Sequence, residues 1–359
     1  MDLIIPAAGK SSRFPNMRPK WLLTHPDGSL MISAALKGIP LKKFERIVLI
    51  VLREHLEKYK CQDGIKKSFI ELGVEDKLNL VILDKPTSSQ PETVAQGLRI
   101  NKTAGSFYIK DTDNYFEVEV KEENAVSTYN LNDLEEVSAA NKSYVSKNDK
   151  GLITNIVEKE IISPEFCCGG YSFASAEDYL KVYDQLSSNK DLYVSHIIFQ
   201  MMLNGEGFRT RPAKSYEDWG TKHAWDKYKS QFATLFLDID GVLVENSGKY
   251  FSPQWGETAP IQKNVDLINR LYNTGKTEVI LTTSRTEEFR DITVKQLQKI
   301  GLKYHRLICD LMHSKRIIVN DYARTNPYPS CSAINVQRNS DSELPEMLNS
   351  VLKSGGKND

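Results

Sequence analysis

The sequence has few cysteines, and they are not arranged to hold a metal ion or a disulfide framework. Their number is odd and no two form a Cys-x-x-Cys pair: Cys61, Cys167, Cys168, Cys309 and Cys331. The six histidines are scattered as well, which argues against a zinc site. We therefore expect free thiols in a reducing compartment, and hence a cytoplasmic protein.

Long apolar runs and an excess of one charge are also missing. No apolar stretch reaches membrane-spanning length, and the run before Pro6 is too short for a signal peptide. Lysine plus arginine and aspartate plus glutamate both number 47, so the formal net charge is zero. A nucleic-acid binder needs a basic footprint, so we expect neither nucleic acid nor membrane insertion. Whether the protein forms a homo-oligomer stays open.

What the sequence does contain is enough apolar material for two domains. It has 359 residues, of which 40% are hydrophobic. Short β-branched or aromatic runs alternate with segments that favour helix, which predicts an α/β fold with mostly parallel sheets covered on both faces. The first four expected strands are Leu3–Pro6, Arg46–Leu52, Leu78–Leu83 and Ser106–Lys110.

A polar segment without an apolar period, residues 221–231, marks the expected boundary. We predict a first domain over residues 1–225, a second over 232–353 and a polar tail over 354–359. The expected strands of the second domain are Ala233–Leu237, Glu278–Thr282, Arg306–Ile308, Arg316–Val319 and Ser332–Val336. Its expected helices are Ile261–Asn273, Glu287–Ile300 and Glu343–Leu352.

The first chemical signal is a strand that runs into a turn of small residues. Residues 3–14 read Leu-Ile-Ile-Pro-Ala-Ala-Gly-Lys-Ser-Ser-Arg-Phe, and Arg-Pro-Lys follows at 18–20. Glycine and serine let backbone N–H groups approach a polyphosphate closely. Arg13 and Lys20 add positive charge at the same place. The pattern indicates a site for a nucleoside triphosphate.

This pattern resembles the nucleotidyltransferases that join a nucleoside triphosphate to a sugar phosphate or alcohol phosphate. Their signature is a strand, then Ala-Gly-x-Gly-x-Arg, then Pro-Lys; here Ser11 replaces the second glycine. The resemblance covers residues 1–225 and implies a GT-A-like, Rossmann-like mixed sheet with Arg13 and Lys20 as catalytic residues. It also implies nucleotide contacts from Ala8, Gly9, Ser11, Ser12, Gln90 and Thr93.

Later motifs fit the same resemblance. Residues 110–115 (Lys-Asp-Thr-Asp-Asn-Tyr) end a strand, and the resemblance makes Asp113 a Mg²⁺ ligand, with Asp111 second. Residues 216–221 (Tyr-Glu-Asp-Trp-Gly-Thr) give Asp218 as the other ligand. Two carboxylates plus phosphate oxygens suit Mg²⁺. The implied acceptor-binding residues are Glu158, Lys159 and Gly170, although a Glu-Lys pair is often a solvated face and Gly-Gly often a bulge.

The second chemical signal is Phe-Leu-Asp-Ile-Asp-Gly-Val at residues 236–242. Strand residues two apart point the same way, so Asp238 and Asp240 would share one pocket. The motif resembles motif one of the haloacid-dehalogenase phosphatases, which implies a Rossmann-like domain. With so little sequence between the motifs, we expect it to be capless. The resemblance makes Asp238 the nucleophile and Asp240 the general acid and base.

The remaining motifs of that family occur in order. The resemblance assigns Thr283 to a phosphoryl oxygen and Lys315 to the charge of the nucleophile, with Arg316 as the alternative. It places Mg²⁺ on Asp238, Asp240 and Asp321. Residues 246–257 form either a small flap over this site or a loop packed on the core.

We therefore expect a bifunctional enzyme of capsule or surface-polysaccharide precursor synthesis that uses Mg²⁺ in both domains. The run Arg-Pro-Lys-Trp-Leu-Leu at 18–23 resembles capsule cytidylyltransferases, which favours CTP as nucleotide. The acceptor would be a phosphorylated sugar, alcohol or amino alcohol, and pyrophosphate would leave. Two alternatives remain: a nucleotide-sugar-binding regulator with one degenerate domain, or a sugar-1-phosphate nucleotidyltransferase that uses UTP or dTTP.

Overall fold

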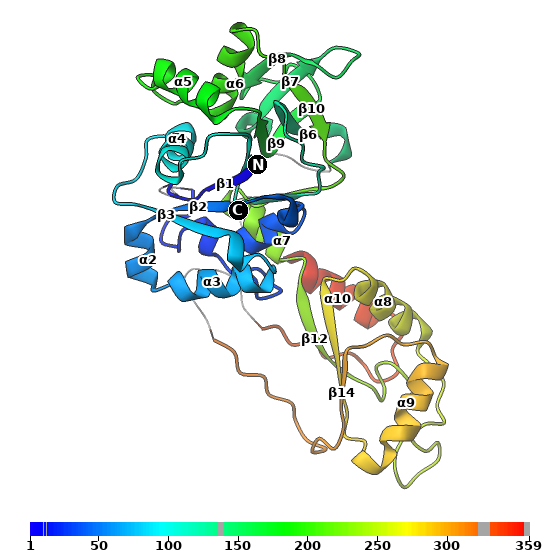
Figure 1. Cartoon of the computed structure of the whole chain (residues 1–359). Coiled ribbons are helices and arrows are strands. Elements are labelled where there is room, and N and C mark those ends of the chain that lie inside the picture. The colour runs from blue at the N-terminus through cyan, green and yellow to red at the C-terminus, as the bar shows by residue number, and fades with distance from the viewer. Residues whose placement is uncertain (10, 12, 135–138, 322–330, 355–359) are drawn as a thin grey trace. The chain divides into compact units, whose positions relative to one another are not determined.

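The computed structural model describes residues 1–9, 11, 13–134, 139–321 and 331–354. The chain forms two compact units, Met1–Ala224 and Trp225–Asp359. In Figure 1 the first unit runs from blue to green and the second from green to red. Each unit has its own sheet, so the two phosphate-handling motifs lie on separate scaffolds.

The sheet of the first unit is mixed. Among the described residues it has nine strands, in the order β10-β6-β9-β4-β1-β2-β3, with β7 and β8 beside β9. The strands are β1 (Asp2–Pro6), β2 (Ile47–Leu52), β3 (Leu78–Leu83), β4 (Phe107–Lys110), β6 (Ala125–Asn130), β7 (Ser143–Lys147), β8 (Ile153–Glu158), β9 (Glu165–Phe173) and β10 (Arg209–Pro212). Pairing is parallel from β4 through β3 and antiparallel around β9. The predicted α/β fold with a mixed sheet is confirmed.

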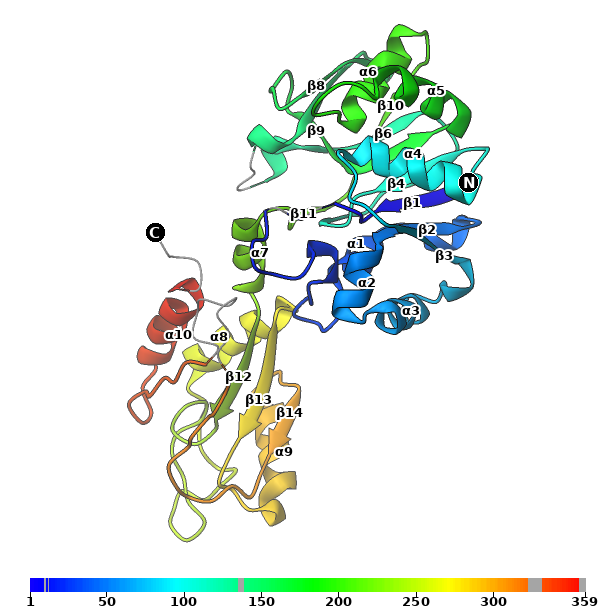
Figure 2. The same ribbon diagram turned by 90° about the vertical axis from the view of Figure 1, so that its left-hand side faces the viewer.

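Helices cover both faces of this sheet. They are α1 (Met31–Leu36), α2 (Arg53–Tyr59), α3 (Gln62–Glu71), α4 (Gln90–Asn101), α5 (Ala176–Leu186) and α6 (Val194–Leu203). The boundary between the two units falls within α7 (Lys222–Lys229). Figure 2 shows α4 on one side of β1 and β2 and the helices α1 to α3 on the other. Short 3-10 turns lie at Lys20–Leu22, Leu41–Lys43, Glu75–Lys77, Leu131–Asp133 and Ala139–Asn141.

The apolar run of β2 explains this layering. Val48 and Ile50 point into the core under α4, α5 and α6, whereas Ile47, Leu49 and Val51 point into the core under α1 and α3. All six residues of β2 are buried. A strand buried on both faces needs a continuous apolar sequence, which is what residues 47–52 supply.

A small antiparallel ribbon stands apart from the main sheet. It pairs β5 (Asn114–Phe116) with β11 (Tyr216–Asp218), so that Asp218 lies opposite Asn114. The ribbon joins segments about a hundred residues apart in sequence at the end of β4.

The second unit is built on a parallel three-stranded sheet, counted over its described residues, in the order β12-β13-β14. The strands are β12 (Ala233–Asp238), β13 (Thr277–Thr282) and β14 (Arg306–Ile308). The helices are α8 (Gln262–Asn273), α9 (Arg290–Lys299) and α10 (Glu343–Ser354), with a 3-10 turn at Glu287–Phe289. Val265 and Ile268 of α8 pack with Leu237 and Leu281 of the strands into one core.

Two predicted strands of the second unit are wrong. Residues 316–319 and 332–336 have no strand structure, and both segments lie in the described part of the chain. Ile317 and Val319 are 76% and 89% exposed. A β-branched run favours extended backbone, but it becomes a strand only when a neighbour pairs its N–H and C=O groups. The tail 355–359 lies outside the described residues.

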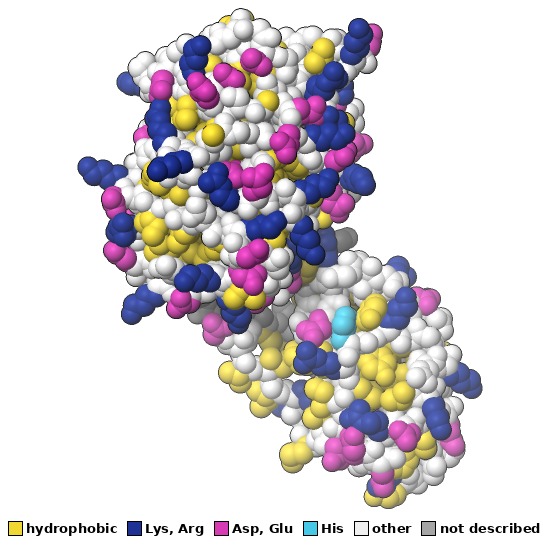
Figure 3. All heavy atoms as spheres, viewed as in Figure 1, with side chains coloured by type: hydrophobic (Ala, Val, Ile, Leu, Met, Phe, Trp, Pro, Cys, Tyr) yellow, Lys and Arg dark blue, Asp and Glu magenta, His cyan; other side chains and the backbone are white. Residues whose placement is uncertain are grey.

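The polar segment expected at the domain boundary is mostly helical, since α7 spans residues 222–229. Trp225 and Asp226 are buried in α7, so a single aromatic anchor holds this helix where the sequence shows no apolar period. Among the described residues, no helix is long and apolar enough to span a membrane. On the face shown in Figure 3, cationic and anionic side chains are interspersed.

Candidate active site

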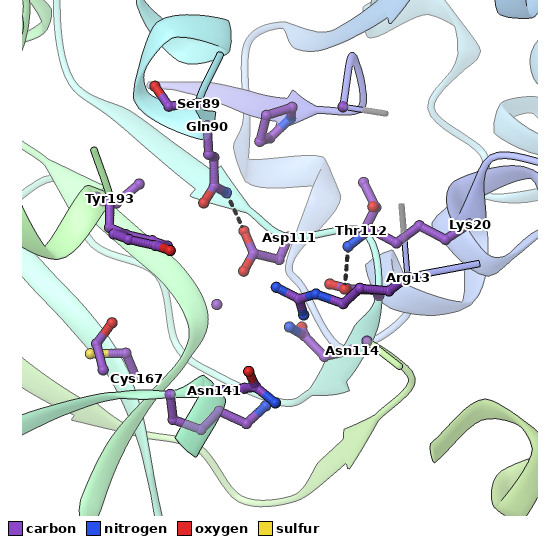
Figure 4. A pocket seen from close by; sticks show the side chains of 18 of the residues that line it. Arg13, Lys20, Ser89, Gln90, Asp111, Thr112, Asn114, Asn141, Cys167 and Tyr193 are labelled. Carbon is purple, nitrogen blue, oxygen red and sulfur yellow. Dashed lines mark hydrogen bonds and ion pairs between the residues drawn. The ribbon is translucent and has the colours of Figure 1, made fainter. Parts of the chain in front are cut away.

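A pocket of about 530 Å³ opens at the carboxyl ends of β1 and β4, which are parallel neighbours. Its walls are the turn after β1, the start of α4, the turn after β4, the adjoining ends of β7 and β8, and the end of β11. A volume of this order suits a small-molecule ligand. Figure 4 shows Arg13, Lys20, Gln90 and Asp111 around it.

Ser11, in the turn after β1, has a backbone conformation that favours glycine. Ser11 has φ +49°, the left-handed region in which glycine is the usual residue. Its hydroxyl accepts a hydrogen bond from the backbone N–H of Lys20 at 3.2 Å. The serine that replaces glycine thus links the turn to Lys20. Gly9, Ser11, Arg13 and Lys20 line the pocket, whereas Ser12 lies outside the described residues.

Asp113 and Asp218 lie close together because the ribbon of β5 and β11 brings their strand ends side by side. Gly220 lies between the two carboxylates. A Cβ at this position would lie 3.0 Å from Asp113 Oδ2 and 3.1 Å from Asp218 Oδ1. Glycine therefore keeps open a hollow that is lined by carboxylate oxygens.

Each of these carboxylates is paired with a lysine. Lys20 Nζ contacts Asp113, and Lys142 Nζ lies 2.6 Å from Asp218 Oδ2. Burial raises the pKa of Asp113, but the charges of Lys20, Lys142 and Lys110 outweigh burial and the net shift is downward. The carboxylate of Asp113 is thus available as an anionic oxygen ligand, and an oxygen of Asp218 lines the same hollow.

The hollow fits a magnesium ion by the chemistry of its donors. Mg²⁺ is commonly held by one or two carboxylates together with substrate phosphates. No group of three or more histidine, cysteine, aspartate or glutamate side chains that could hold a metal occurs among the described residues. Asp113 and Asp218 would therefore hold the ion together with the oxygens of a bound nucleotide.

A buried lysine shapes the turn that carries Asp111 and Asp113. Lys110 is fully buried, and its Nζ donates to Asp111 O (2.8 Å), Asn114 O (2.9 Å) and Asn114 Oδ1 (2.6 Å). Burial lowers its pKa to about 8. Since all three of its N–H groups have acceptors, Lys110 fixes the turn by hydrogen bonding and is not available to a ligand.

Asp111 faces the pocket on the opposite side of this turn. Its carboxylate accepts a hydrogen bond from Gln90 at the start of α4, drawn as a dashed line in Figure 4. Burial, and next the charge of Asp113, raise the pKa of Asp111 to about 6. The lysine-paired Asp113 therefore ionises more readily than Asp111, and its role as the metal ligand stays a prediction.

The predicted acceptor residues form the far wall. Glu158 accepts hydrogen bonds from the hydroxyls of Ser143 and Ser195, the latter at 2.8 Å. The Nζ of Lys159 contacts the Tyr193 hydroxyl and lies 4.4 Å from the centre of its ring. Glu158 and Lys159 are thus held by defined partners and both line the pocket.

Two predicted residues do not line the pocket. Ala8 is fully buried in the core of the sheet. Gly170 faces away, because a Cβ there would meet the Tyr108 hydroxyl at 2.0 Å; its neighbour Gly169 lines the pocket instead. Consecutive residues of β9 point to opposite faces, so a shift of one residue exchanges them. Gln90 and Thr93 do line the pocket.

Among the lining residues that sequence reasoning missed are Lys142, Tyr193, Ser195 and Tyr216. Tyr216 belongs to the predicted Asp218 motif, so that motif could have pointed to it. The other three lie just before β7 and at the start of α6, which carry no motif, so only the pairing of distant elements reveals them.

In the second unit, Asp240 is held by an arginine that the sequence analysis did not single out. Arg285 is fully buried and donates to both oxygens of Asp240, at 2.9 Å from Nε and 2.8 Å from Nη2. The same guanidinium donates to Gln296 (2.8 Å) and Thr293 (3.2 Å) of α9. The Ser247 hydroxyl also donates to Asp240, at 2.9 Å.

The other predicted residues of this site are only partly brought together. Asp238 lies opposite Thr282 in the β12–β13 pairing, so Thr283 follows at the same sheet edge. Burial raises the pKa of Asp238, and the charge of Asp240 adds to the rise, while Arg316 and Arg285 oppose it. Arg316, whose Nη2 donates to Ser284 at 3.0 Å, is therefore one of two cations, with Arg285, that act on Asp238.

Lys315 and Asp321 are exposed and lie on a segment without strand pairing. Within the described ranges, Asp321 does not join Asp238 and Asp240 in a cluster of metal-binding side chains. The strand expected at 316–319 would have carried Asp321 to the sheet edge, and its absence explains the difference. The segment 246–257, expected as either a flap or a loop packed on the core, is tied to the turn before α9, because Trp255 packs edge-on against Phe289.

Comparison with solved structures identifies the fold of the first unit. A nucleoside-diphosphate-sugar pyrophosphorylase from Vibrio cholerae RC9 matches 63% of this chain and 98% of its own, with 18% identity and a TM-score of 0.54. The inositol-1-phosphate CTP transferase from T. maritima matches 62% of this chain and 90% of its own, with 16% identity and a TM-score of 0.51. No family model and no curated protein matches the sequence.

These structures are nucleotidyltransferases, and at such low identity the likeness shows the fold. The matched share is close to the size of the first unit. The nucleotidyltransferase fold predicted from the first motif is thus confirmed, while the haloacid-dehalogenase fold of the second unit stays a prediction.

Proposed function

We propose that the first unit transfers a nucleotidyl group from a nucleoside triphosphate, with CTP favoured, to a phosphorylated sugar, alcohol or amino alcohol. The observation that carries this proposal is the convergence of Lys20 and the turn after β1 with Asp113 and Asp218 in one pocket. The choice of CTP draws support from the run at residues 18–23 and from the T. maritima neighbour, which is named for CTP.

The reaction is an in-line displacement. An oxygen of the acceptor's phosphate attacks the α-phosphorus, the bond from that phosphorus to the bridging oxygen breaks, and pyrophosphate leaves. No covalent intermediate with the protein forms, so this chain contributes positioning and charge. Arg13 and Lys20 neutralise the triphosphate, and a magnesium ion on Asp113 and Asp218 would supply further positive charge to its oxygens.

A panel of substrates tests this function. Wild type and Lys20→Ala are incubated with each of the four nucleoside triphosphates and a set of phosphorylated metabolites, and pyrophosphate and products are measured by mass spectrometry. We expect wild type to use CTP. We expect Lys20→Ala to lose activity by orders of magnitude, because it removes a charge-assisted hydrogen bond to the phosphates. Exclusive use of UTP or dTTP by wild type would refute the CTP assignment.

The control for this panel is Lys37→Ala. Lys37 forms an exposed ion pair with Asp27, at 2.7 Å, and does not line the pocket. Its replacement should leave pyrophosphate release unchanged. Equal turnover of Lys20→Ala and wild type would contradict the assignment of this pocket.

For the second unit we propose phosphate monoester hydrolysis in the same pathway of capsule or surface-polysaccharide precursor synthesis. Asp238 would attack phosphorus, the bond to the leaving alcohol oxygen would break, and Asp240 would protonate that oxygen. Water would then release phosphate from the aspartyl-phosphate. Support comes from the shared sheet edge of Asp238, Asp240 and Thr283.

One observation favours the alternative that the second unit binds a phosphorylated ligand without turnover. Asp321, the expected third metal ligand, lies on an exposed segment without strand pairing, and the described residues contain no group of three metal-binding side chains. Release of inorganic phosphate from a panel of phosphate monoesters decides between hydrolysis and binding. Absence of release from every member, with binding retained, would favour the regulatory function.

A further inference from the structure

Asp111 is a third carboxylate of the pocket, and the proposed transfer gives it no task. Asp113 and Asp218 are each paired with a lysine and are the proposed metal ligands. Among the described residues, the side chain of Asp111 makes one hydrogen bond, which it accepts from the uncharged amide of Gln90. A further carboxylate adds negative charge to a pocket for anions, so its place beside this amide needs a reason of its own.

The position of Asp111 is fixed by the sheet and not by Gln90. Its backbone N–H donates to the carbonyl of Gly169 at 2.9 Å, and its own carbonyl accepts from Lys110 Nζ at 2.8 Å. Gly169 also makes room for the side chain, since a Cβ there would lie 2.6 Å from Asp111 Oδ2. The ends of β4 and β9 thus hold this carboxylate in place, and Gln90 adapts to it.

The contact with Asp111 determines which way the amide of Gln90 points. A carboxylate accepts hydrogen bonds and donates none, whereas an amide has one donating and one accepting side. Gln90 must therefore turn Nε2 to Asp111 and Oε1 away from it. In Figure 4 the dashed line joins the amide nitrogen to Asp111, and the amide oxygen points to the side where Tyr193 lies. Among the described residues, no group donates to this oxygen.

The wall that contains Gln90 suits a base better than a phosphate. The loop before α4 and the start of α4 line the pocket with uncharged polar side chains only: Thr87, Ser88, Ser89, Gln90 and Thr93. The cations Arg13 and Lys20 lie at the turn after β1, where the triphosphate would bind, and the far wall carries charged side chains as well. An uncharged heterocycle is recognised by hydrogen bonds from neutral groups, so we place the base at the start of α4.

We propose that Asp111 determines base specificity by holding the Gln90 amide so that Oε1 accepts a hydrogen bond from the amino group of cytosine. Cytosine has an amino group at C4, where uracil and thymine have a carbonyl oxygen. An oxygen fixed opposite that carbonyl would leave two acceptors without a donor, which costs binding free energy. The inference rests on the nucleotidyl transfer proposed for the first unit and gives its CTP preference a physical cause. Asp111 acts through Gln90 and is a positioning residue.

Binding of CTP and of UTP to the full chain tests this role. Both are titrated by calorimetry with Mg²⁺ and without an acceptor, and the quantity compared is the ratio of their Kd values. The two nucleotides share ribose and triphosphate, so a general loosening of the pocket weakens both and leaves the ratio unchanged. We expect wild type to bind CTP about tenfold to hundredfold more tightly than UTP, the effect of one mismatched buried hydrogen bond.

Asp111→Asn should remove this selectivity. The asparagine amide can donate as well as accept, so Gln90 can turn either side to the base, and the ratio should come within about threefold of one. Gln90→Ala should lose the same selectivity. Adding Asp111→Asn to Gln90→Ala should change the ratio no further, because a residue that acts through Gln90 has no effect without it.

Asp84→Asn is the matched control. Asp84 directly follows β3, pairs with Arg53 at 2.6 Å and does not line the pocket, so this variant should keep the wild-type ratio. An unchanged preference for CTP in Asp111→Asn, or an equal loss in Asp84→Asn, would overturn the role of Asp111 and leave the proposed transfer standing. A preference for CTP that depends on Asp111, in a protein that releases no pyrophosphate with any acceptor, would uphold the role and reject the transfer.

Discussion

At the scale of single residues, the first site is defined by how each charge is paired. Asp113 and Asp218 each have a lysine partner, whereas Asp111 has a neutral one, Gln90. An unpaired buried carboxylate is costly to ionise. Three aspartates in one pocket thus have different electrostatic environments, although the sequence alone makes them look alike.

This difference predicts a pH dependence of stability. The folded-state pKa of Asp111, about 6, lies above its ordinary value of 3.8. Its protonated form is therefore favoured by folding. That contribution to stability is full below the ordinary value and is lost as the pH rises through about 6. We expect Asp111→Asn to stabilise the protein at pH 7.5 by about 1–3 kcal/mol, because the cost of ionisation disappears.

The measurement is the thermal midpoint of wild type and Asp111→Asn at pH 4 and at pH 7.5. The gain from the substitution should be much smaller at pH 4, where Asp111 is protonated in the folded state and only about half ionised in the unfolded state. Asp76→Asn, at an exposed position of a 3-10 turn, serves as the control and should show no such trend. A gain of equal size at both pH values would show that ionisation of Asp111 is not its cause.

At the scale of elements, turns and strand ends position the functional side chains. In the first unit, Lys110 ties the turn after β4 to the start of β5. In the second, Arg285 ties the end of β12, through Asp240, to α9. Both are buried cations with all their main donors satisfied by nearby polar groups, so each locks a loop to its neighbouring element.

Arg285→Met should therefore destabilise the second unit by about 3–5 kcal/mol, since it leaves Asp240 as a half-buried charge without its partner. Chemical denaturation of the full chain measures the loss of stability. Phosphate release and pyrophosphate release are measured on the same variant to follow the two activities. Nucleotidyl transfer by the first unit should persist. Arg306→Met is the control, because Arg306 is 71% exposed and its ion pair with Glu278 is long, at 3.6 Å. Equal loss of stability in both variants would contradict a special role for Arg285.

Elements were predictable where the local sequence and the tertiary pairing agree. The run Ile47–Leu52 favours a strand and is paired on both sides by β1 and β3. The run 316–319 (Arg-Ile-Ile-Val) is also rich in β-branched residues, yet none of its residues has a strand partner in the described part of the chain. Both runs favour extended backbone, and a neighbouring strand is available only to the first.

At the scale of the whole molecule, the two motifs belong to two units with separate sheets and separate cores. Each proposed reaction draws its residues from one unit only. The pocket of the first unit is lined by residues up to Thr221, and the Asp238 site uses residues of the second unit. The two activities should therefore be separable by substitution.

Asp238→Asn should abolish phosphate release and leave pyrophosphate release from CTP within about twofold of wild type. The physical reason is that it removes the attacking carboxylate oxygen of one unit and changes no residue of the other pocket. Both products are measured in the same incubation. The control Asp266→Asn, on the exposed face of α8, should retain both activities. Loss of pyrophosphate release in Asp238→Asn would show that the two sites depend on each other.

The sequence by itself determined the two strand-to-turn motifs and the order of the motifs behind them. It could do so because a strand, a turn of small residues and the carboxylates at a strand end depend on residues that are close together in the sequence. Only the tertiary structure decided which lysine meets which carboxylate. Lys20 and Asp113 are 93 residues apart, and Lys142 and Asp218 are 76 apart. Such contacts depend on sheet order and strand register, which no local pattern specifies.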